Sequence, residues 1–541
     1  MFLRRYIGLP LYGSWYLWYD LGKGSWPAFK PLPFTLEICK DMLNGGCYVE
    51  PYIDSRLWDI LDGPDRKSDW RWSTHGKKFA VKLADGTIPM EHYGSITYAV
   101  MCPCAKGWQE ELFELTKSVA AFAPAVYHDQ VMTAQGFRCF DRTHGHALNA
   151  PKAWITEGYR PLYERIRKAT PNCVHTSEEV SEPYVNLFDG GHIWRWTFDG
   201  QVPAFQAVYG GRMQYLALVY DSHGKGEYKS NFVKLANSMV NGLMLGKMGL
   251  NELYNADAKR VFLKKMAHLR LALINYFNVG EMLPPVKFAT PVPVMTTEWA
   301  TSSKVNEPVT MPKIVSNSYQ YGENRVFLFV NTTEETLTVK PRIEAIYLCL
   351  EGMSAPVRFE GKTRLGAYQT AVAVKGSAAE AERIQKTLLK IASFTPGDSF
   401  DSLVEFKDHR EFTLAKGDFA GTDKISGFYN CTKAVSGKYF GNTVDGSLIS
   451  YGTVDFGTSK VTEITISAAV PEQYAGGTID LLTGPNQNVR EVAGTFTVPA
   501  TDGWTDFQDF TFKLNRPMTG KCNIIFRFNR NACCNFAGWK Y

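Results

Sequence analysis

The sequence predicts a multidomain protein of α/β and β structure: a (β/α)8-type barrel, then a small antiparallel β-sandwich, then a C-terminal all-β domain. Three observations predict this fold class. Over residues 1–283, short apolar runs alternate with stretches of helical spacing, as in repeated parallel β/α units. Beyond residue 284 the helical spacing stops, and beyond residue 400 strand-like segments, glycines and turns dominate. A chain of 541 residues is also too long for one hydrophobic core.

The predicted barrel occupies residues 1–283, and its strands are short apolar segments. They are 7–19, 46–54, 95–102, 121–131, 172–177, 191–196 and 202–209. Helical spacing occurs at 34–43, 107–119, 154–168, 232–248 and 253–277. These segments give about seven strands, which is fewer than a closed barrel needs. We therefore expect that the natural protein has further residues before this chain.

The rest of the chain divides where the pattern changes. Residues 284–375 are predicted as the antiparallel sandwich, with a β-hairpin over 324–343 around the turn residues NTTEET. Residues 376–400 are predicted as a helical linker, because 376–392 has helical spacing. Residues 401–541 are predicted as the third, all-β domain.

The composition argues against several classes of function. The net charge is +5 and no dense block of Lys and Arg occurs, so nucleic-acid binding is not indicated. No apolar run reaches the ~18 residues of a membrane span, so we expect no membrane partner. Aromatic residues make up 13% of the chain, with 13 Trp and 27 Tyr. Such side chains suit half-wet sites and stack on sugar rings, which favours a polysaccharide or glycan partner.

The cysteines and the N-terminus bear on metal content and compartment. The chain has 11 cysteines but no paired CxxC motifs, so we expect no structural zinc site and no other metal or cofactor in the barrel. The residues before the first predicted strand are too few for a signal peptide. We expect a secreted or cell-surface protein whose signal sequence is absent from this chain, with a cytoplasmic protein as the alternative.

Polar residues end the most strand-like run, Ala121–Val131. The apolar stretch stops at His128, Asp129 and Gln130. A parallel barrel has its active site at the carboxyl ends of its strands, so Asp129 is a candidate catalytic acid. The alternative is a strand that ends in a solvated turn.

Four separated segments stand out in the C-terminal part of the chain. They are GNTVDGSLISYGTVDFG (441–457), GGTIDLLTG (476–484), TFTVPATDGWTDFQ (495–508) and CNIIFRFN with CCNFAGWKY (522–541). These segments resemble family 6 carbohydrate-binding modules, in the order that the family has them. The resemblance implies a jelly-roll sandwich that holds polysaccharide in a loop cleft. It leaves a structural calcium ion open, although the family's early Glu, a calcium ligand, is not evident here.

The same resemblance implies roles for four residues of the module. In the family, one aromatic ring stacks on each side of a sugar ring and an Asn hydrogen-bonds the sugar. Trp504 stands at one stacking position and Asn535 at the position of the Asn. Asn442 stands where the family usually has the second aromatic ring, so Tyr439 or Phe440 would replace it. The alternative is a sandwich that has lost sugar binding.

Six segments of residues 7–375 carry a second, more distant resemblance. They are PYIDSRLWD (51–59), MCPCAKGWQEEL (101–112), AVYHDQV (125–131), DRTHGH (141–146), HTSEEVSEPY (175–184) and VPAFQAVYG (202–210). Together they resemble glycosidase-like barrel proteins related to the endo-α-N-acetylgalactosaminidases. The resemblance implies glycoside hydrolysis, with a strand-end Asp as nucleophile and a carboxylate from a later strand as acid/base. It assigns these roles to Asp129 and Glu178. The family's Tyr-(Leu/Val)-Asp appears here as Tyr127-His128-Asp129.

Glycoside hydrolysis needs one ionised carboxylate and one protonated carboxyl at the same sugar carbon. Glu179 and Glu182 compete with Glu178 for the acid role. Glu178 is preferred because it comes first after the apolar strand, where a side chain points to the barrel mouth.

Further residues are predicted to contact substrate. For Asp54, Arg56 and Asp59, an ion pair that ties a loop is an equal alternative. For Asp141, His144 and His146 of the DRTHGH loop, the alternative is a metal site. Since that loop offers only two His and no clear third ligand, we prefer sugar contact. The predicted substrate-binding residues are Asp54, Arg56, Asp59, His128, Asp141, His144, His146 and Trp194.

The leading hypothesis is therefore a glycoside hydrolase, retaining at an α-linkage, with an appended carbohydrate-binding module. The second hypothesis is a non-catalytic glycan-binding protein on a degenerate barrel. A third is a glycosyl transferase that uses the same two acids with a sugar acceptor in place of water.

Overall fold

The computed structural model describes residues 2–541 except 17, 20–25, 28–29, 62–70, 149–152, 194–202, 219–228, 249–252, 254–256, 301–305, 397–403, 445 and 530–531. The chain forms two compact units. The first consists mainly of residues 3–248 and 262–394, and the second mainly of residues 249–261 and 395–541. Among the described residues, no helix is both long and apolar enough to cross a membrane.

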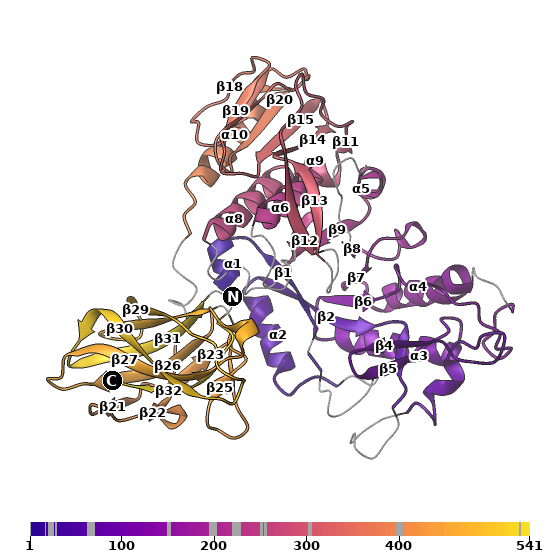
Figure 1. Cartoon of the computed structure of the whole chain (residues 1–541). Coiled ribbons are helices and arrows are strands. Elements are labelled where there is room, and N and C mark those ends of the chain that lie inside the picture. Colours follow the sequence, from indigo (N-terminus) through magenta and orange to yellow (C-terminus); the bar gives the residue numbers. More distant parts are fainter. Residues whose placement is uncertain are drawn as a thin grey trace. The chain divides into compact units, whose positions relative to one another are not determined.

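A parallel seven-stranded sheet forms the N-terminal part of the first unit (Figure 1). Each adjacent pair is parallel, and the strands follow one another in sequence order, as in a (β/α) barrel. No pairing of the first strand with the last is found among the described residues, so the sheet is a curled half-barrel. The strands are β1 (Leu11–Trp15), β2 (Cys47–Asp54), β6 (Ala125–Asp129), β7 (Val174–Glu178), β8 (Gly190–Ile193), β9 (Gln214–Leu218) and β10 (Met244–Lys247).

Helices connect these strands. Helix α3 (Lys106–Ala120) illustrates how the sequence produces a helix that packs on the sheet. Its buried residues Trp108, Leu112, Leu115 and Val119 recur every three or four positions, which gives one apolar stripe. Part of this stripe packs with Ile53 and neighbouring strand residues in a common core. The helices are α1 (Phe2–Ile7), α2 (Thr35–Asn44), α3 (Lys106–Ala120), α4 (Arg160–Ala169), α5 (Ala204–Tyr209), α6 (Lys229–Val240), α8 (Asp257–Ala272) and α9 (Ile274–Asn278).

Two of the predicted barrel strands are wrong. Residues 95–102 belong to a separate antiparallel sheet of β3 (Leu57–Asp59), β5 (Ile96–Val100) and β4 (Met90–Tyr93). Most of 202–209 is helix α5. The strands β9 and β10 take their places, and β10 lies inside the predicted helix 232–248. Short apolar runs have no periodicity that separates a buried strand from a buried helix, so the sequence pattern misassigned them.

A six-stranded antiparallel sheet forms the C-terminal part of the first unit. Within it, β14 and β15 make a hairpin around Gly322, whose φ of 58° suits glycine. The predicted hairpin over 324–343 is therefore wrong, because β16 pairs with β19 instead. The strand order is β11 (Glu281–Met282), β14 (Ile314–Tyr321), β15 (Asn324–Asn331), β20 (Thr370–Lys375), β17 (Tyr347–Leu350) and β18 (Val357–Arg358), with separate pairs β12 (Val294–Ala300) to β13 (Asn306–Pro312) and β16 (Leu337–Val339) to β19 (Thr363–Leu365).

The helix predicted as a linker is part of this unit. Helix α10 (Ala378–Ala392) begins at Ser377, whose side chain accepts a hydrogen bond from the Glu380 N–H at 3.2 Å. Its residues Ile384, Leu388 and Ile391 are fully buried, and the helix packs against β17 and β20. Residues 378–392 therefore close the core of the first unit rather than join two domains.

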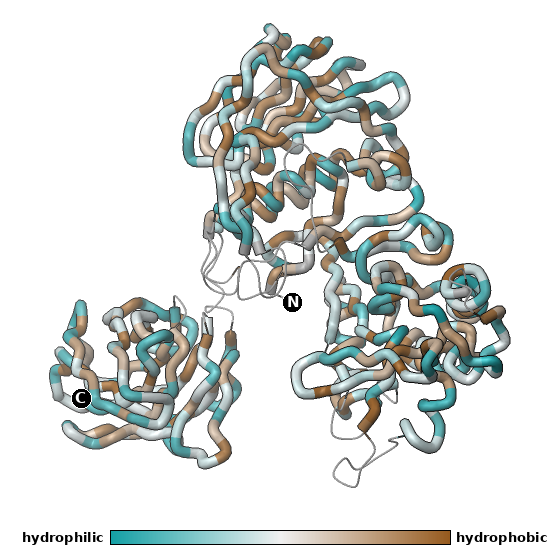
Figure 2. The backbone as a smooth tube through the Cα atoms, turned by 45° about the vertical axis from the view of Figure 1, so that its right-hand side comes forward, coloured by the Kyte–Doolittle hydropathy of each residue, from teal (hydrophilic) through white to brown (hydrophobic). Residues whose placement is uncertain are grey.

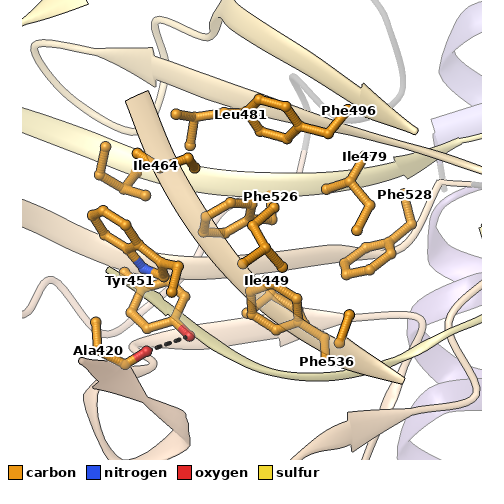
Figure 3. Close-up of a cluster of buried hydrophobic side chains, with 14 of the residues drawn as sticks. Ala420, Ile449, Tyr451, Ile464, Ile479, Leu481, Phe496, Phe526, Phe528 and Phe536 are labelled. Carbon is orange, nitrogen blue, oxygen red and sulfur yellow. Dashed lines mark hydrogen bonds between the residues drawn. The ribbon is translucent and has the colours of Figure 1, made fainter. Parts of the chain in front are cut away.

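The second unit contains a two-sheet β-sandwich. Its strands carry both hydrophobic and hydrophilic residues (Figure 2), and buried hydrophobic side chains from the two sheets pack together in one core between them (Figure 3). Within that core Tyr451 donates its O–H to the Ala420 carbonyl at 3.2 Å. One sheet holds β21 (Glu411–Thr413), β26 (Leu448–Asp455), β31 (Lys521–Asn529), β28 (Thr478–Gly484), β29 (Glu491–Thr497) and β23 (Gly427–Tyr429); the other holds β24 (Thr432–Lys433), β25 (Phe440–Gly441), β32 (Asn535–Lys540), β27 (Val461–Ala469), β30 (Gln508–Met518) and β22 (Ala420–Gly421).

Candidate active site

Three acidic side chains lie side by side at the carboxyl ends of three neighbouring parallel strands. In the sheet register, Asp54 of β2 pairs with Asp129 of β6. The β6–β7 register pairs His128 with Ser177, so the next residues, Asp129 and Glu178, are level with each other. Since side chains alternate along a strand, residues at the same level share a face of the sheet. The structure thus brings the two predicted catalytic acids to one place.

Two tyrosines hold Asp129. Tyr52 donates its O–H to Oδ2 at 2.8 Å, and Tyr127 donates to Oδ1 at 2.9 Å. Burial, together with the charge of Asp129, raises the pKa of both tyrosines well above the usual value, so both remain donors. Hydrogen bonds to a carboxylate stabilise its charged form. The sequence prediction missed these tyrosines, although each stands two residues before an acid on its own strand.

The surroundings of Glu178 favour its protonated form. Its carboxyl lies within hydrogen-bonding reach of Asp129. Burial, and next the negative charge of Asp129, raise the pKa of Glu178 to about 8. A carboxyl with that pKa is mostly protonated at neutral pH. The pair therefore combines an acid that favours the ionised form with one that favours the protonated form.

The Asp54 carboxyl accepts hydrogen bonds from the backbone. Its Oδ1 accepts the N–H of Arg56 at 2.7 Å and the N–H of Leu57 at 2.8 Å. Burial and the charge of Asp129 raise its pKa well above the usual value, against the effect of these two N–H groups. Because Asp54 is only 1% exposed, the predicted sugar contact is corrected to a role in fixing the turn that carries Arg56.

A pocket of about 610 Å³ opens beside Glu178. Arg56 forms part of its wall, where it makes an ion pair with Glu91 and donates to the Gln135 carbonyl at 2.9 Å. Its guanidinium also lies over the Phe137 ring, 5.6 Å from the centroid. Charged groups beside aromatic faces are typical of small-ligand pockets. The remaining lining residues are Met90, His92, Tyr93, Gln130, Thr133 and Ala134.

A further carboxylate, Glu50, lies deeper on the same face. It accepts hydrogen bonds from Ser14 Oγ at 2.9 Å and from Thr176, and its Oε2 lies 3.1 Å from His192 Nε2. Burial opposes ionisation, but His192 and the O–H groups of Thr176 and Tyr12 lower the pKa of Glu50 overall. The sequence analysis missed Glu50 because it interrupts an otherwise apolar strand. Its partner His192 packs against Tyr127, with ring centroids 4.6 Å apart.

The backbone turns sharply directly after each catalytic candidate. Gln130 has a φ of 66° and Glu179 a φ of 56°, values that residues other than glycine rarely adopt. Such conformations persist where surrounding contacts enforce them, and they cluster at functional sites. The Glu179 N–H donates to the His192 carbonyl at 2.8 Å, which is one such contact.

His128 is on the opposite face of the sheet from Asp129. It is fully buried, and its Nε2 lies 3.0 Å from His175 Nδ1. Its Nδ1 lies 3.2 Å from both the Ser55 and Tyr163 hydroxyls, the latter from α4. The predicted sugar contact of His128 is therefore wrong, because consecutive strand residues point to opposite faces.

Other predicted residues also lie away from the carboxyl pair. Asp59 is 3% exposed and accepts the Leu61 N–H at 2.9 Å, so it fixes a local turn. The competitor Glu182 is exposed and accepts the Tyr209 hydroxyl. Trp194 lies outside the described residues.

The loop with Asp141, His144 and His146 has a different environment from the one predicted. Asp141 makes an ion pair with Lys82 and accepts the Thr143 N–H at 2.8 Å. The two histidine rings face cysteine sulfurs and do not line the pocket. Their predicted role in sugar binding is thus corrected, and the structure places the two histidines together with Cys102 and Cys139.

In the second unit, the predicted sugar-binding residues gather around Asn535. Its Nδ2 donates to the Trp504 carbonyl at 2.6 Å, and Gly441 lies against its Oδ1. Asn442, next to Gly441, is exposed with a φ of 52°. Tyr439 is half-buried, 5.4 Å from the Phe507 ring centroid.

Two aromatic residues alter the prediction for this cleft. Phe440 is 1% exposed and belongs to the core, so it is excluded as a stacking ring. Tyr474, which the sequence analysis did not name, is 46% exposed with its ring centroid 5.2 Å from Trp504. Tyr439, Tyr474 and Trp504 are thus aromatic rings in the neighbourhood of Asn535 that are not fully buried.

The N-terminal and C-terminal parts of the chain match two different protein families. Residues 2–220 match a domain of unknown function, DUF6259. Residues 422–540 match the carbohydrate-binding modules of family 6, which confirms the predicted module. The relation of the barrel to endo-α-N-acetylgalactosaminidases stays a prediction.

A curated relative is a Bacteroides thetaiotaomicron protein named "Putative glycoside hydrolase". It is 26% identical over 343 residues, which are 61% of this chain and 49% of that protein. The chain thus matches about half the length of this relative.

Two solved structures illustrate the similarity of each part. A GH31 family sulfoquinovosidase from E. rectale is aligned at a TM-score of 0.44 and 11% identity, over 65% of this chain and 55% of that one. A family 6 module from Clostridium stercorarium in complex with cellobiose is aligned at a TM-score of 0.21 and 19% identity, over 24% of this chain and 95% of that one.

Proposed function

We propose that the first unit is a retaining glycoside hydrolase acting on an α-linkage, with Asp129 as nucleophile and Glu178 as acid/base. The observation that carries the proposal is the contact between these two carboxyls in opposite environments. Tyr52 and Tyr127 stabilise charge on Asp129, while burial keeps a proton on Glu178. Glycoside hydrolysis requires this division of protonation states.

In the proposed reaction, Glu178 donates its proton to the glycosidic oxygen as the bond to the anomeric carbon breaks. An oxygen of Asp129 bonds to that carbon, and the leaving sugar departs as an alcohol. Glu178, now ionised, removes a proton from water, and the hydroxide oxygen displaces Asp129. The two carboxyls together carry one negative charge before and after each step, so the reaction requires no cofactor.

The spacing of the pair supports retention. Inverting enzymes leave ~6.5–9.5 Å between their carboxyls for a water molecule, whereas a retaining pair is only ~5–5.5 Å apart. The Glu178 carboxyl interacts directly with Asp129, which favours the closer, retaining arrangement over the wider, inverting one. The α-linkage is inferred from the sequence resemblance, and the named relative supports hydrolysis of a glycoside.

The family 6 module would hold the enzyme on a polysaccharide or glycan. Tethering raises the effective concentration of substrate at the first unit without new contacts there. We further propose a secreted or cell-surface location, where such substrates occur.

A screen of the full chain on α-linked polysaccharides and mucin-type glycans tests the proposal. With the best substrate, Asp129→Asn is expected to reduce kcat by at least about 1,000-fold, because the nucleophile is lost. The matched control is Glu182→Gln, an exposed acid that should leave kcat within about twofold. Wild-type rates in Asp129→Asn would overturn the proposed nucleophile. A wild-type chain that binds these glycans but hydrolyses none would favour the non-catalytic alternative.

A further inference from the structure

Two cysteines and two histidines converge beside the pocket, and the proposed reaction uses none of them. They are Cys102, Cys139, His144 and His146, and one ligand atom of each lies within 4.8 Å of all the others. Cys139 Sγ and His144 Nδ1 are 3.4 Å apart. Around a tetrahedral zinc ion with bonds of ~2.0–2.3 Å, ligand atoms are roughly 3.3–3.8 Å from one another. The cluster needs only small adjustments to reach that geometry.

Backbone carbonyls orient both imidazole rings for this role. His144 Nε2 lies 2.8 Å from the Lys78 carbonyl, and His146 Nδ1 lies 2.9 Å from the Ala147 carbonyl. A carbonyl only accepts, so these nitrogens carry the hydrogens and the other nitrogen of each ring has a free lone pair. Those two are His144 Nδ1, beside Cys139, and His146 Nε2, which is buried without a hydrogen-bond partner among the described residues. Metal-bound histidines are typically held in this way.

The cysteine sulfurs have matching surroundings. The Cys102 and Cys139 side chains are within hydrogen-bonding reach of each other. The backbone N–H of Lys82 points at Cys139, and that of Cys104 at Cys102. N–H groups that point at a metal-bound sulfur belong to the outer shell that orients such a ligand.

We propose that Cys102, Cys139, His144 and His146 bind a zinc ion as a closed, structural Cys₂His₂ site. Four protein ligands fill a tetrahedral zinc site, which leaves no position for a catalytic water. The ion would tie together the segments 78–82, 102–104 and 139–146, which are far apart in sequence. Phe137 and Gln135 of the adjoining loop line the pocket, so the ion would fix one pocket wall. This inference does not depend on the proposed reaction.

Zinc content of the full chain, purified without metal-affinity resin from zinc-supplemented medium, tests the site. Elemental analysis should find about one zinc per chain, and Cys139→Ser and His146→Ala should each reduce it at least about tenfold. The matched control is Cys173→Ser, a buried cysteine of the same unit outside the cluster, which should keep its zinc.

X-ray absorption at the zinc edge of the wild-type protein provides a measurement that needs no variant. Two sulfurs at ~2.3 Å and two nitrogens at ~2.0–2.1 Å are expected. The inference is overturned if the zinc-loaded wild type contains no zinc after desalting, if the ligands are oxygens, or if Cys102 and Cys139 are found joined in a disulfide. It is equally overturned if folded Cys139→Ser and His146→Ala both keep a full zinc complement.

Discussion

Asp129 and Glu178 have the same chemistry in water but different surroundings in this fold. Asp129 accepts two tyrosine hydroxyls, whereas the pKa of Glu178 is raised to about 8 by burial and by the charge of Asp129. Two carboxylates this close repel each other, so a single negative charge is shared within the pair. The better hydrogen-bonded residue, Asp129, is the one that keeps it.

The raised pKa of Glu178 predicts a pH-dependent stability that needs no substrate. In the unfolded chain a Glu loses its proton near pH 4.3, and in the folded protein near pH 8. Between these values the folded state binds more protons, so wild-type stability falls as the pH rises through this window. Glu178→Gln cannot ionise and avoids this loss.

Urea unfolding at pH 5 and pH 9 measures the effect. Glu178→Gln should gain stability relative to wild type at pH 9 compared with pH 5, and Glu182→Gln, at an exposed site, should show no such trend. A Glu178→Gln difference that is the same at both pH values would mean that Glu178 titrates normally and is not the protonated member of the pair.

At the level of elements, the parallel strands β2, β6 and β7 carry the candidate site, and the sequence predicted all three. The strands that end at Asp54 and Asp129 are mainly apolar, whereas the strand that ends at Glu178 is more polar. In each case the acid stands at the carboxyl end of its strand, so position along the strand sufficed. The partners of the acids were not predictable in this way, since Tyr52 and Tyr127 resemble core residues until the register is known. His128 was misassigned because the prediction considered only its position near the end of the strand. It did not consider which face of the sheet the side chain occupies.

Contacts between residues far apart in the chain were also not predictable from the sequence pattern. Cys102 and Cys139 are 37 positions apart in the chain, and no local spacing marks them as neighbours of His144 and His146. Similarly, α10 has helical periodicity, which predicts a helix but not the sheet that it covers. Only the tertiary packing shows that it belongs to the core.

Substitution on α10 tests its role as part of the core. Leu388→Ala removes a fully buried side chain and should lower the free energy of unfolding of the first unit by about 2–5 kcal/mol. The neighbouring Leu389 is 43% exposed, so Leu389→Ala should change it by less than about 0.5 kcal/mol. Equal, small effects of both substitutions in urea unfolding would restore the linker interpretation.

At the level of the whole molecule, the chain joins a candidate catalytic half-barrel to a carbohydrate-binding sandwich. Each unit has its own core, so the two functions can be separated by substitution. Tethering gains most on insoluble or polymeric substrates, where the local concentration of linkages limits the rate. On a small soluble glycoside the module gives no such advantage.

Trp504→Ala tests this division. Loss of one stacking ring should weaken binding of the full chain to its preferred polysaccharide at least about tenfold, because ring stacking supplies much of such affinity. Hydrolysis of a small soluble glycoside should stay within about twofold of wild type. The control is Phe419→Ala, an aromatic residue that is 48% exposed outside the cleft. If Trp504→Ala binds polysaccharide normally, the sandwich has lost its ancestral cleft or uses another face.

Mass spectrometry can detect directly whether Asp129 forms a bond to the sugar. The full chain is incubated with a fluorinated, activated α-glycosyl donor of its preferred sugar, which slows hydrolysis of the intermediate, and is then digested. One glycosyl adduct is expected, on the peptide that contains Asp129, and none in Asp129→Asn. An adduct on a different carboxylate, or steady turnover with inverted product and no adduct, would contradict the proposed role of Asp129.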